Sequence, residues 1–371
     1  MRSKTLQFVS SLALCAVLIL AAGCSSAPEP EAKAPPAITK PAGTPIEITP
    51  PLGLPPVPIP ANNPPTAETI ALGRRLYYDQ MLSVDKTIAC ASCHGAESGF
   101  ADPRQFSEGV GGKKGGRQAP SVINAAYYTT QFWDGRAASL EEQALGPMQN
   151  PVEMAHTLDG VTKALASEPT YAPEFEKAFG PGPVTIEKAA MAIASFERTV
   201  LSGNSPFDRY LYGGDKSALN DSAKRGLEVF RDPKKGNCAK CHTIEEKYAL
   251  FSDSKFHNLG VGANLDGTLS DLGRFEVTKN EADKGAFKTP TLRNITQTAP
   301  YMHDGSLKTL KEVIDFYIGA GNSNPFRDKD VLELDHLTGQ ERKDLEAFLE
   351  SLTGELPAST GKPEAMTSTV Q

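Results

Sequence analysis

The chain has 371 residues and a formal net charge of −7 at pH 7. A chain of this length is long enough for two domains of ordinary size. Its basic residues form no long stripe, only short clusters at Lys113–Arg117 and Lys234–Lys235, so nucleic acid is excluded as an expected partner. The small acidic excess fits a soluble protein and indicates nothing sharper.

The first residues have the pattern of an export signal. Basic Arg2 and Lys4 precede an apolar stretch that ends in the small-residue sequence Leu20-Ala-Ala-Gly-Cys24. This ending resembles the bacterial lipoprotein box, which implies cleavage before Cys24 and lipid on its sulfur and amine. An ordinary signal peptide with a fortuitous cysteine is the alternative. We expect a signal peptide over 1–23 and a chain anchored through Cys24 to the periplasmic face of a bacterial membrane.

Both ends of the remaining chain have compositions that bury little surface. From Pro28 to Pro65, 14 of 38 residues are proline. Such a segment favours an extended polyproline-like conformation, so we predict a tether over 24–65. Residues 357–371 are rich in Ser, Thr, Gly and Pro, and we predict a disordered tail.

Two matching arrangements of cysteine and histidine lie between these ends. They are Cys90-Ala-Ser-Cys93-His94 and Cys238-Ala-Lys-Cys241-His242. Two thiols at this spacing reach the two vinyl groups of one porphyrin, and the histidine that follows lies under the iron as an axial ligand. A zinc site would need further thiols or imidazoles nearby, and between the two motifs the chain offers only His156. The motifs predict two covalently bound c-type haems.

The sequence that follows each motif repeats at a constant offset of 170 residues. Pro120–Asn124 corresponds to Pro290–Asn294, Trp133–Gly135 to His303–Gly305, and Leu140 to Leu310. Helical patterns dominate, at 66–78, 139–145, 184–201, 221–230, 308–317 and 339–352, and alternating strands are scarce. We predict an all-α fold of two tandem cytochrome-c-like domains, at 66–210 and 211–356, with the haems near the domain interface.

The repeat also predicts that the two haems differ. Adding 170 to Pro147 gives Tyr317, so if Tyr317 faces the second iron, Pro147 faces the first, and proline has no side-chain donor. The loop 95–119 contains neither histidine nor methionine. The first iron is therefore expected to be open to small oxidants and the second to be closed. Met302 is the competing ligand, and a buried helix aromatic is the alternative role for Tyr317.

Three side chains are candidates for chemistry at the open haem. A carboxylate at Glu153 could take a proton from the near oxygen of a peroxide and return it to the leaving oxygen. Gln143 could orient peroxide or water, and Trp133, the only tryptophan, could shorten electron transfer between two porphyrins. The alternatives are an ion-paired or capping glutamate, a surface glutamine and a core tryptophan.

Haem carboxylates need hydrogen-bond donors, and guanidinium groups pair well with them. Arg136, Arg274 and Arg293 are candidate partners. His257 and His303 are expected to hydrogen-bond either haem carboxylates or backbone, with a ligand role as the minority interpretation.

Taken together, these residues resemble the bacterial di-haem cytochrome c peroxidase family, which includes the MauG-type enzymes. The resemblance covers about 66–355 and rests on both CxxCH motifs, Gln131–Arg136, Gly146–Met154, Thr289–Asn294 and Thr298–Gly305. It implies that the haem held by His94 is the peroxidatic centre, with Glu153 as acid and base and Gln143 as its polar neighbour. It also implies that Trp133 bridges the haems and that electrons enter at the C-terminal haem.

Two departures place the chain nearer the MauG-like branch. Peroxidases of the family usually have methionine where Tyr317 stands, and MauG-type proteins have tyrosine. Many peroxidases also have a histidine seven residues before the Arg117 position, where this chain has Val110. Both differences imply an enzyme that is ready without reductive activation.

The family also binds calcium between the haems, through an asparagine side chain and two backbone carbonyls. The carbonyls map to Thr298 and Pro300, but the asparagine is Gln118 here. One calcium ion is expected on this resemblance, with Gln118 as the position that puts it in doubt.

The leading hypothesis is a lipid-anchored periplasmic peroxidase that reduces hydrogen peroxide to water. Its electrons would come from a small redox protein, a cytochrome c or a cupredoxin. One alternative is MauG-type, peroxide-dependent oxidation of a protein or organic substrate. Another is a non-enzymatic di-haem cytochrome that only transfers electrons. A homodimer is left open.

Overall fold

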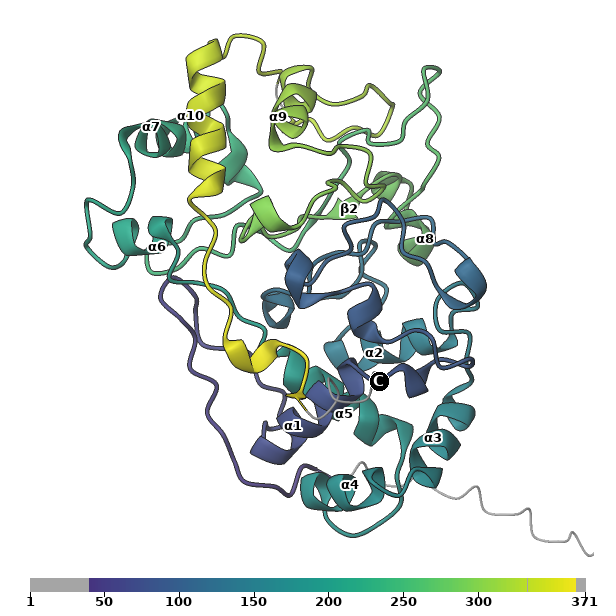
Figure 1. Ribbon diagram of the computed structural model, residues 1–371. Coiled ribbons are helices and arrows are strands. Elements are labelled where there is room, and N and C mark those ends of the chain that lie inside the picture. The colour runs from purple at the N-terminus through teal and green to yellow at the C-terminus, as the bar shows by residue number, and fades with distance from the viewer. Residues whose placement is uncertain (1–39, 332, 365–371) are drawn as a thin grey trace, which may run out of the picture. The chain divides into compact units, whose positions relative to one another are not determined.

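The computed structural model describes residues 40–331 and 333–364 (Figure 1). The predicted signal peptide, the lipidation site Cys24 and the first part of the predicted tether lie outside these residues. Within the described part of the chain, no helix is both long enough and apolar enough to cross a membrane.

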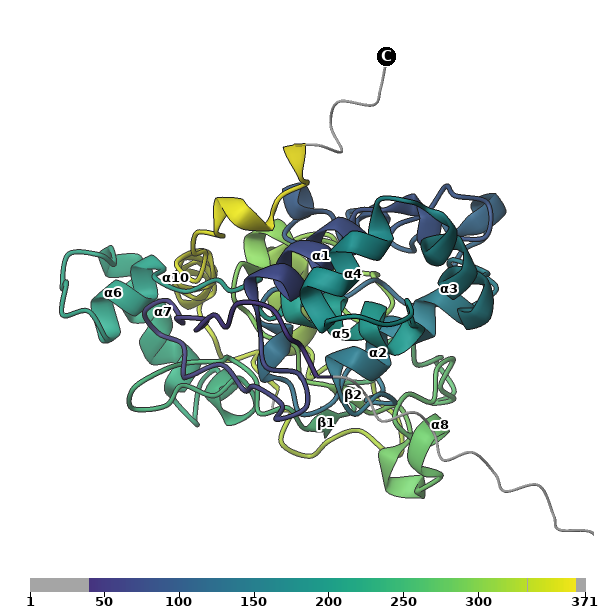
Figure 2. The same ribbon diagram turned by 90° about the horizontal axis from the view of Figure 1, so that it is seen from below.

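The first domain is built from five α-helices. They are α1 (Ala67–Tyr77), α2 (Leu140–Gln149), α3 (Leu158–Ser167), α4 (Tyr171–Phe179) and α5 (Ile186–Glu197). The side chain of Thr66 caps α1 and that of Thr185 caps α5, so each helix begins at a residue that satisfies its free backbone N–H groups. Figures 1 and 2 show α1, α4 and α5 side by side. Their apolar side chains belong to one core cluster.

The second domain has α6 (Pro206–Leu211), α7 (Asp221–Arg231), α8 (Phe275–Thr278), α9 (Leu310–Ile318) and α10 (Gly339–Glu350). Strands β1 (Phe256–His257) and β2 (Phe287–Lys288) pair antiparallel, with Phe256 opposite Lys288. The prediction of a helix-dominated fold with two cytochrome-c-like domains is confirmed. Short 3-10 turns and loops fill the space between the helices, including both CxxCH motifs.

One helix crossing recurs in both domains and supports the internal repeat. In the first domain α1 lies against α5, and a Cβ atom at Gly73 would collide with the backbone carbonyl of Ala192. In the second domain α7 lies against α10, and a Cβ atom at Gly226 would collide with the carbonyl of Asp344. Glycine at each crossing lets the two backbones approach closely.

The tether prediction is wrong for its described part, residues 40–65. Asn63 is fully buried, and its Nδ2 donates to the carbonyl of Met191 at 3.0 Å. The carbonyl of Gly53 accepts a hydrogen bond of 2.8 Å from Arg293. A high proline content predicts an extended backbone, and this segment uses that backbone to follow both domains and satisfy its polar groups on them.

The tail prediction is wrong for residues 357–364. Thr360 is buried, and its carbonyl accepts a hydrogen bond of 2.9 Å from the Tyr78 hydroxyl. Arg74 donates from Nε to the carbonyl of Gly361 at 2.6 Å. After α10 the chain therefore returns from the second domain to α1 of the first domain (Figure 1).

A fully buried ion pair joins α6 to the loop before α9. The Arg293 guanidinium donates to both carboxylate oxygens of Asp208, at 2.8 and 2.9 Å, and the two side chains are 1% and 0% exposed. It also donates to the carbonyls of Ala249 and Gly53. Phe207, beside Asp208, packs in the core of the second domain, so α6 belongs to that core although it lies before residue 211.

We predict that Arg293→Met lowers the free energy of unfolding by about 3–5 kcal/mol, because it leaves the Asp208 carboxylate buried without its counter-charge. Denaturant titration followed by circular dichroism measures this. The control is Lys163→Met, which removes the ammonium of an exposed pair with Asp159 and should cost less than about 1 kcal/mol. Equal losses in the two variants would contradict the assignment.

Candidate active site

The second CxxCH motif opens onto a large cavity. Cys238, Cys241 and His242 line it from one side. Its other walls are largely apolar and come from α7, α9 and α10, through Phe230, Leu310, Val313, Ile314, Leu345 and Leu349. Two thiols and an imidazole on an apolar cavity match the covalent and axial attachments of a c-type haem, so the residues present fit this group.

His242 is held in the orientation that an axial ligand needs. Its Nδ1 lies 2.8 Å from the carbonyl of Phe251, which assigns the proton to Nδ1. The lone pair of Nε2 is then free to bind iron. Burial lowers the pKa of His242, which favours the neutral imidazole. A neutral ring with a fixed tautomer is the form that binds iron.

The first motif repeats this proximal arrangement. Burial lowers the pKa of His94, opposed by the carbonyls of Phe100 and Pro120, which face its ring. Its Nδ1 is buried and makes no full hydrogen bond within the described residues. The backbone of His94 is fixed instead, since its carbonyl accepts a hydrogen bond of 2.8 Å from the Tyr77 hydroxyl. The first imidazole is thus neutral but less firmly anchored than the second.

Both candidate sixth ligands of the second haem line the second cavity. Tyr317 reaches it from α9, and Met302 from the loop that precedes this helix. Burial raises the pKa of Tyr317, and the nearby thiols of Cys238 and Cys241 raise it further. The phenol therefore lies close to the attachment cysteines.

Glu153 lies close to the first motif. Its carboxylate raises the pKa of the thiols of Cys90 and Cys93, though less than their burial does. Burial raises the pKa of Glu153 itself, opposed by a hydrogen bond of 2.6 Å from Asn150 Nδ2 and by the charge of Arg136. A carboxyl group whose pKa is raised keeps its proton to a higher pH than an exposed one, so it can both give and take a proton.

Val110 and Gln143 are the other positions near the first motif that the sequence singles out. Val110 donates from its backbone N–H to the carbonyl of Glu153 at 2.8 Å, so the position of the missing histidine is next to the candidate base. Gln143 lies half-buried on α2, one turn before Pro147. No described contact joins its side chain to Glu153.

Trp133 lies where the two domains meet. Its Nε1 donates to the carbonyl of Gln118 at 2.8 Å, and its ring centre lies 6.5 Å from that of His303. Its own carbonyl accepts a hydrogen bond of 2.8 Å from the backbone N–H of Lys288. Trp133 comes from the first domain and lines the cavity of the second motif.

The residues expected to bind calcium line the same cavity. Gln118, Thr298 and Pro300 all line the cavity beside Trp133. Gln118 uses its Nε2 to donate to the carbonyl of Asp102 at 3.2 Å, which leaves its Oε1 available as an oxygen ligand. An amide oxygen and two carbonyls fit a hard cation.

The three arginines proposed as haem-carboxylate partners are engaged elsewhere. Arg293 is fully buried against Asp208, and Arg274 donates to the carbonyls of Asp134 and Gly135. Arg136 pairs with Asp134 at 3.0 Å.

A further arginine, Arg117, forms ion pairs that the sequence did not predict. It binds Asp134 at 2.6 Å from the first domain and Asp271 at 2.7 Å from the second. No spacing in the sequence signals this pair, since Asp271 lies 154 residues away.

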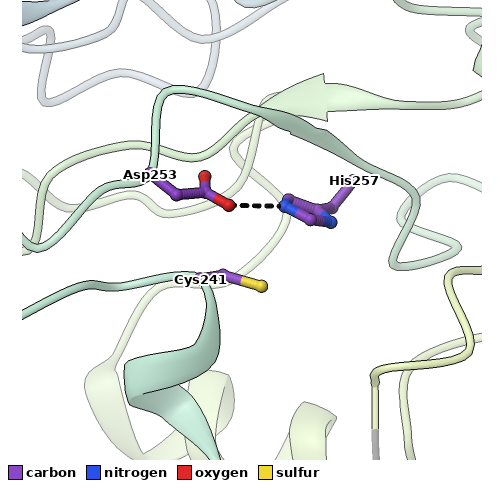
Figure 3. A group of neighbouring side chains, drawn as sticks. All are labelled: Cys241, Asp253 and His257. Carbon is purple, nitrogen blue, oxygen red and sulfur yellow. Dashed lines mark hydrogen bonds and ion pairs between the residues drawn. The ribbon is translucent and has the colours of Figure 1, made fainter.

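A second cluster beside the cavity contains His257 between two carboxylates. Its Nε2 lies 3.0 Å from Asp253 and its Nδ1 lies 2.5 Å from Asp328. Figure 3 shows His257 facing Asp253, with Cys241 below them. Hydrogen bonds with Asp253, then Cys241 and then Asp328 raise the pKa of His257 to about 11. The cluster is not a metal site, because Cys241 belongs to the CxxCH motif and the histidine is held as a cation.

Comparison with known proteins supports the assignment. The model of the di-haem cytochrome c peroxidase family matches residues 67–216, and that of the cytochrome c family matches 223–353. The methylamine utilization protein MauG of Methylorubrum extorquens is 40% identical over 311 residues, which cover 83% of this chain and 84% of the relative. The chain belongs to the di-haem cytochrome c peroxidase and MauG family.

The chain is also similar to a peroxidase and to another MauG-like protein. The cytochrome c551 peroxidase of Nitrosomonas europaea is 39% identical over 300 residues, covering 81% of this chain and 84% of the relative. The crystal structure of a MauG-like protein associated with microbial copper homeostasis superposes with a TM-score of 0.75 at 33% identity. It covers 84% of this chain and 96% of that chain. Membership implies two c-type haems, one for each CxxCH motif.

We predict that Tyr317→Phe changes the low-spin signal of the ferric protein, because the variant keeps the ring and removes the only donor atom of the side chain. Absorption and electron paramagnetic resonance spectra measure this. Met302→Leu is the matched variant and should leave the signal unchanged. The opposite pattern would assign the sixth ligand to Met302.

Proposed function

We propose that this protein reduces hydrogen peroxide to water at the first haem site with electrons from a small redox protein. It is an oxidoreductase of the class that acts on peroxide. The observation that carries the proposal is the placement of Glu153, a half-buried carboxyl group with a raised pKa close to Cys90 and Cys93. The second site instead presents Tyr317 and Met302 on its cavity wall.

The chain's own contribution to peroxide cleavage is the movement of one proton. Haem, when bound, supplies an iron that takes the peroxide and holds oxidising equivalents. The Glu153 carboxylate accepts the proton of the near oxygen and, once protonated, donates it to the leaving oxygen, which departs as water. Asn150 holds the carboxylate through Oε1, so that Oε2 is free to exchange the proton.

Electron transfer between the two sites needs a fixed path. Trp133 offers one, because its N–H is bound to Gln118 and its carbonyl to Lys288, which fix both ends of the residue. A small donor protein, a cytochrome c or a cupredoxin, would deliver electrons to the second site.

A second candidate function is MauG-type oxidation of a protein or organic substrate. Two residues favour it. Tyr317 stands in the second cavity where peroxidases usually have methionine, and Val110 stands beside Glu153 where many of them have a blocking histidine. Without that histidine the first site needs no rearrangement before it accepts peroxide. In this case the oxidising equivalents would leave through the same Trp133 junction to a substrate at the surface.

The remaining parts of the proposal concern placement in the cell and a further ion. We infer export under the signal at 1–23 and attachment to the periplasmic face of a membrane through lipid on Cys24. We also infer one calcium ion held by Gln118, Thr298 and Pro300. A homodimer is compatible with this arrangement and is decided by measurement of mass in solution.

We predict that Glu153→Gln slows peroxide decay by about 100-fold or more, since general acid–base assistance contributes on the order of 10²–10⁴-fold. Stopped-flow mixing with peroxide measures this. In the wild type the rate should fall with decreasing pH below the raised pKa of Glu153, because protonation removes the base, and the variant should lose this limb. Glu187→Gln, at an exposed position on α5, is the control. Unchanged kinetics in Glu153→Gln would remove the residue from the mechanism.

We predict that the ferric protein has one high-spin and one low-spin haem at rest. The reason is that Tyr317 and Met302 both line the second cavity, whereas Pro147 holds the corresponding position in the first domain. Electron paramagnetic resonance separates the two species. Two low-spin haems, unchanged after reduction by one electron, would instead identify a carrier without catalytic activity.

A further inference from the structure

The wall of the second cavity carries an unusual charge. Among its described lining residues, Lys288 is the only lysine or arginine. Two other charged groups on the wall already have partners, since His257 is held between Asp253 and Asp328, and Asp330 lies 3.7 Å from Lys240. The ammonium of Lys288 is therefore the one cation of this wall without a carboxylate of its own.

Lys288 is fixed by three contacts that contain no negative charge. Its Nζ donates to the carbonyl of Thr130 at 2.8 Å and lies 3.7 Å from the centre of the Tyr128 ring. Its backbone N–H donates to the carbonyl of Trp133 at 2.8 Å. The nearest acid, Asp134, is already bound by Arg117 and Arg136 and forms no ion pair with Lys288.

A buried ammonium without an anion is unfavourable. Lys288 is 7% exposed, and this burial lowers its pKa to about 7. Transfer of such a group from water is offset only by an adjacent opposite charge or by loss of the proton. Thr130, whose carbonyl accepts from Lys288 Nζ, is not among the residues that line the cavity, and its buried hydroxyl makes no hydrogen bond in the described structure. The Lys288 ammonium therefore lies on the cavity wall without an opposite charge, and an acceptor that carries negative charge would supply it.

We propose that Lys288 is the counter-ion of a carboxylate of the second haem and holds that edge of the porphyrin against the Trp133 loop. A porphyrin of this type carries two carboxylates, and the arginines first expected to bind them are engaged elsewhere. The proposal rests on haem attachment at Cys238 and Cys241 and not on peroxide reduction.

Two consequences distinguish this role from a purely structural one. A positive charge at the porphyrin edge stabilises the reduced haem more than the oxidised haem, so its removal should lower the midpoint potential. The carboxylate itself should change its vibration when its charged partner is lost. A lysine that only fastens the Trp133 loop would affect neither property.

The test uses the haem-loaded protein and the variant Lys288→Gln, which keeps an N–H donor for Thr130 and removes the charge. Resonance Raman spectra follow the haem-propionate bending band, and spectroelectrochemistry follows the midpoint potential of the low-spin haem. We expect a shifted band and a reduced-to-oxidised ratio, at fixed applied potential, that is roughly tenfold lower. Lys288→Arg should restore both properties, because its guanidinium keeps the charge.

Lys311→Gln is the matched control, since it removes an exposed lysine from α9, the helix that carries Tyr317. It should leave both the band and the potential unchanged. A wild-type band and potential in Lys288→Gln would overturn the proposal, and so would a loss of thermal stability alone. Both readouts are taken without peroxide, so failure of the peroxidase assignment and failure of this inference are distinguishable.

Discussion

The structure depends on one short junction, the hydrogen bond between the backbone of Trp133 in the first domain and that of Lys288 in the second. It fixes the tryptophan on the wall of the second haem cavity. Arg117 reinforces the junction by pairing with an aspartate from each domain. Electron transfer between two metal centres depends steeply on geometry, so a fixed junction, more than either domain alone, is what a two-haem mechanism requires.

The two halves are copies in architecture and differ in chemistry. Each has a glycine-mediated helix crossing and a partly buried proximal histidine whose pKa is lowered by desolvation. They differ at the position that α2 and α9 share, where the first half has Pro147 and the second has Tyr317. Duplication therefore supplies two similar haem supports, and we propose that a few substitutions in equivalent helices separate a reactive site from an electron-transfer site.

The segments outside the two repeats connect them. Residues 40–65 follow both domains and are held at Asn63 by a buried hydrogen bond, and residues 357–364 bind the first domain through the carbonyl of Thr360. The buried pair of Arg293 and Asp208 fixes the first segment through the carbonyl of Gly53. Composition suggested that these segments would be free, but a proline-rich chain has few internal hydrogen bonds and readily takes partners from a surface beside it.

The sequence by itself determined the haem motifs, the helical repeat and the candidate base, because each of these is written in contiguous residues or at one constant offset. Tertiary structure alone decided which arginines already have a carboxylate partner. Arg293 pairs with Asp208, 85 residues away, and Arg117 pairs with Asp271, 154 residues away. It also decided that Lys288 is a buried cation without an acid partner. Such pairings depend on how distant segments pack, and neither spacing nor periodicity encodes that packing in a single chain.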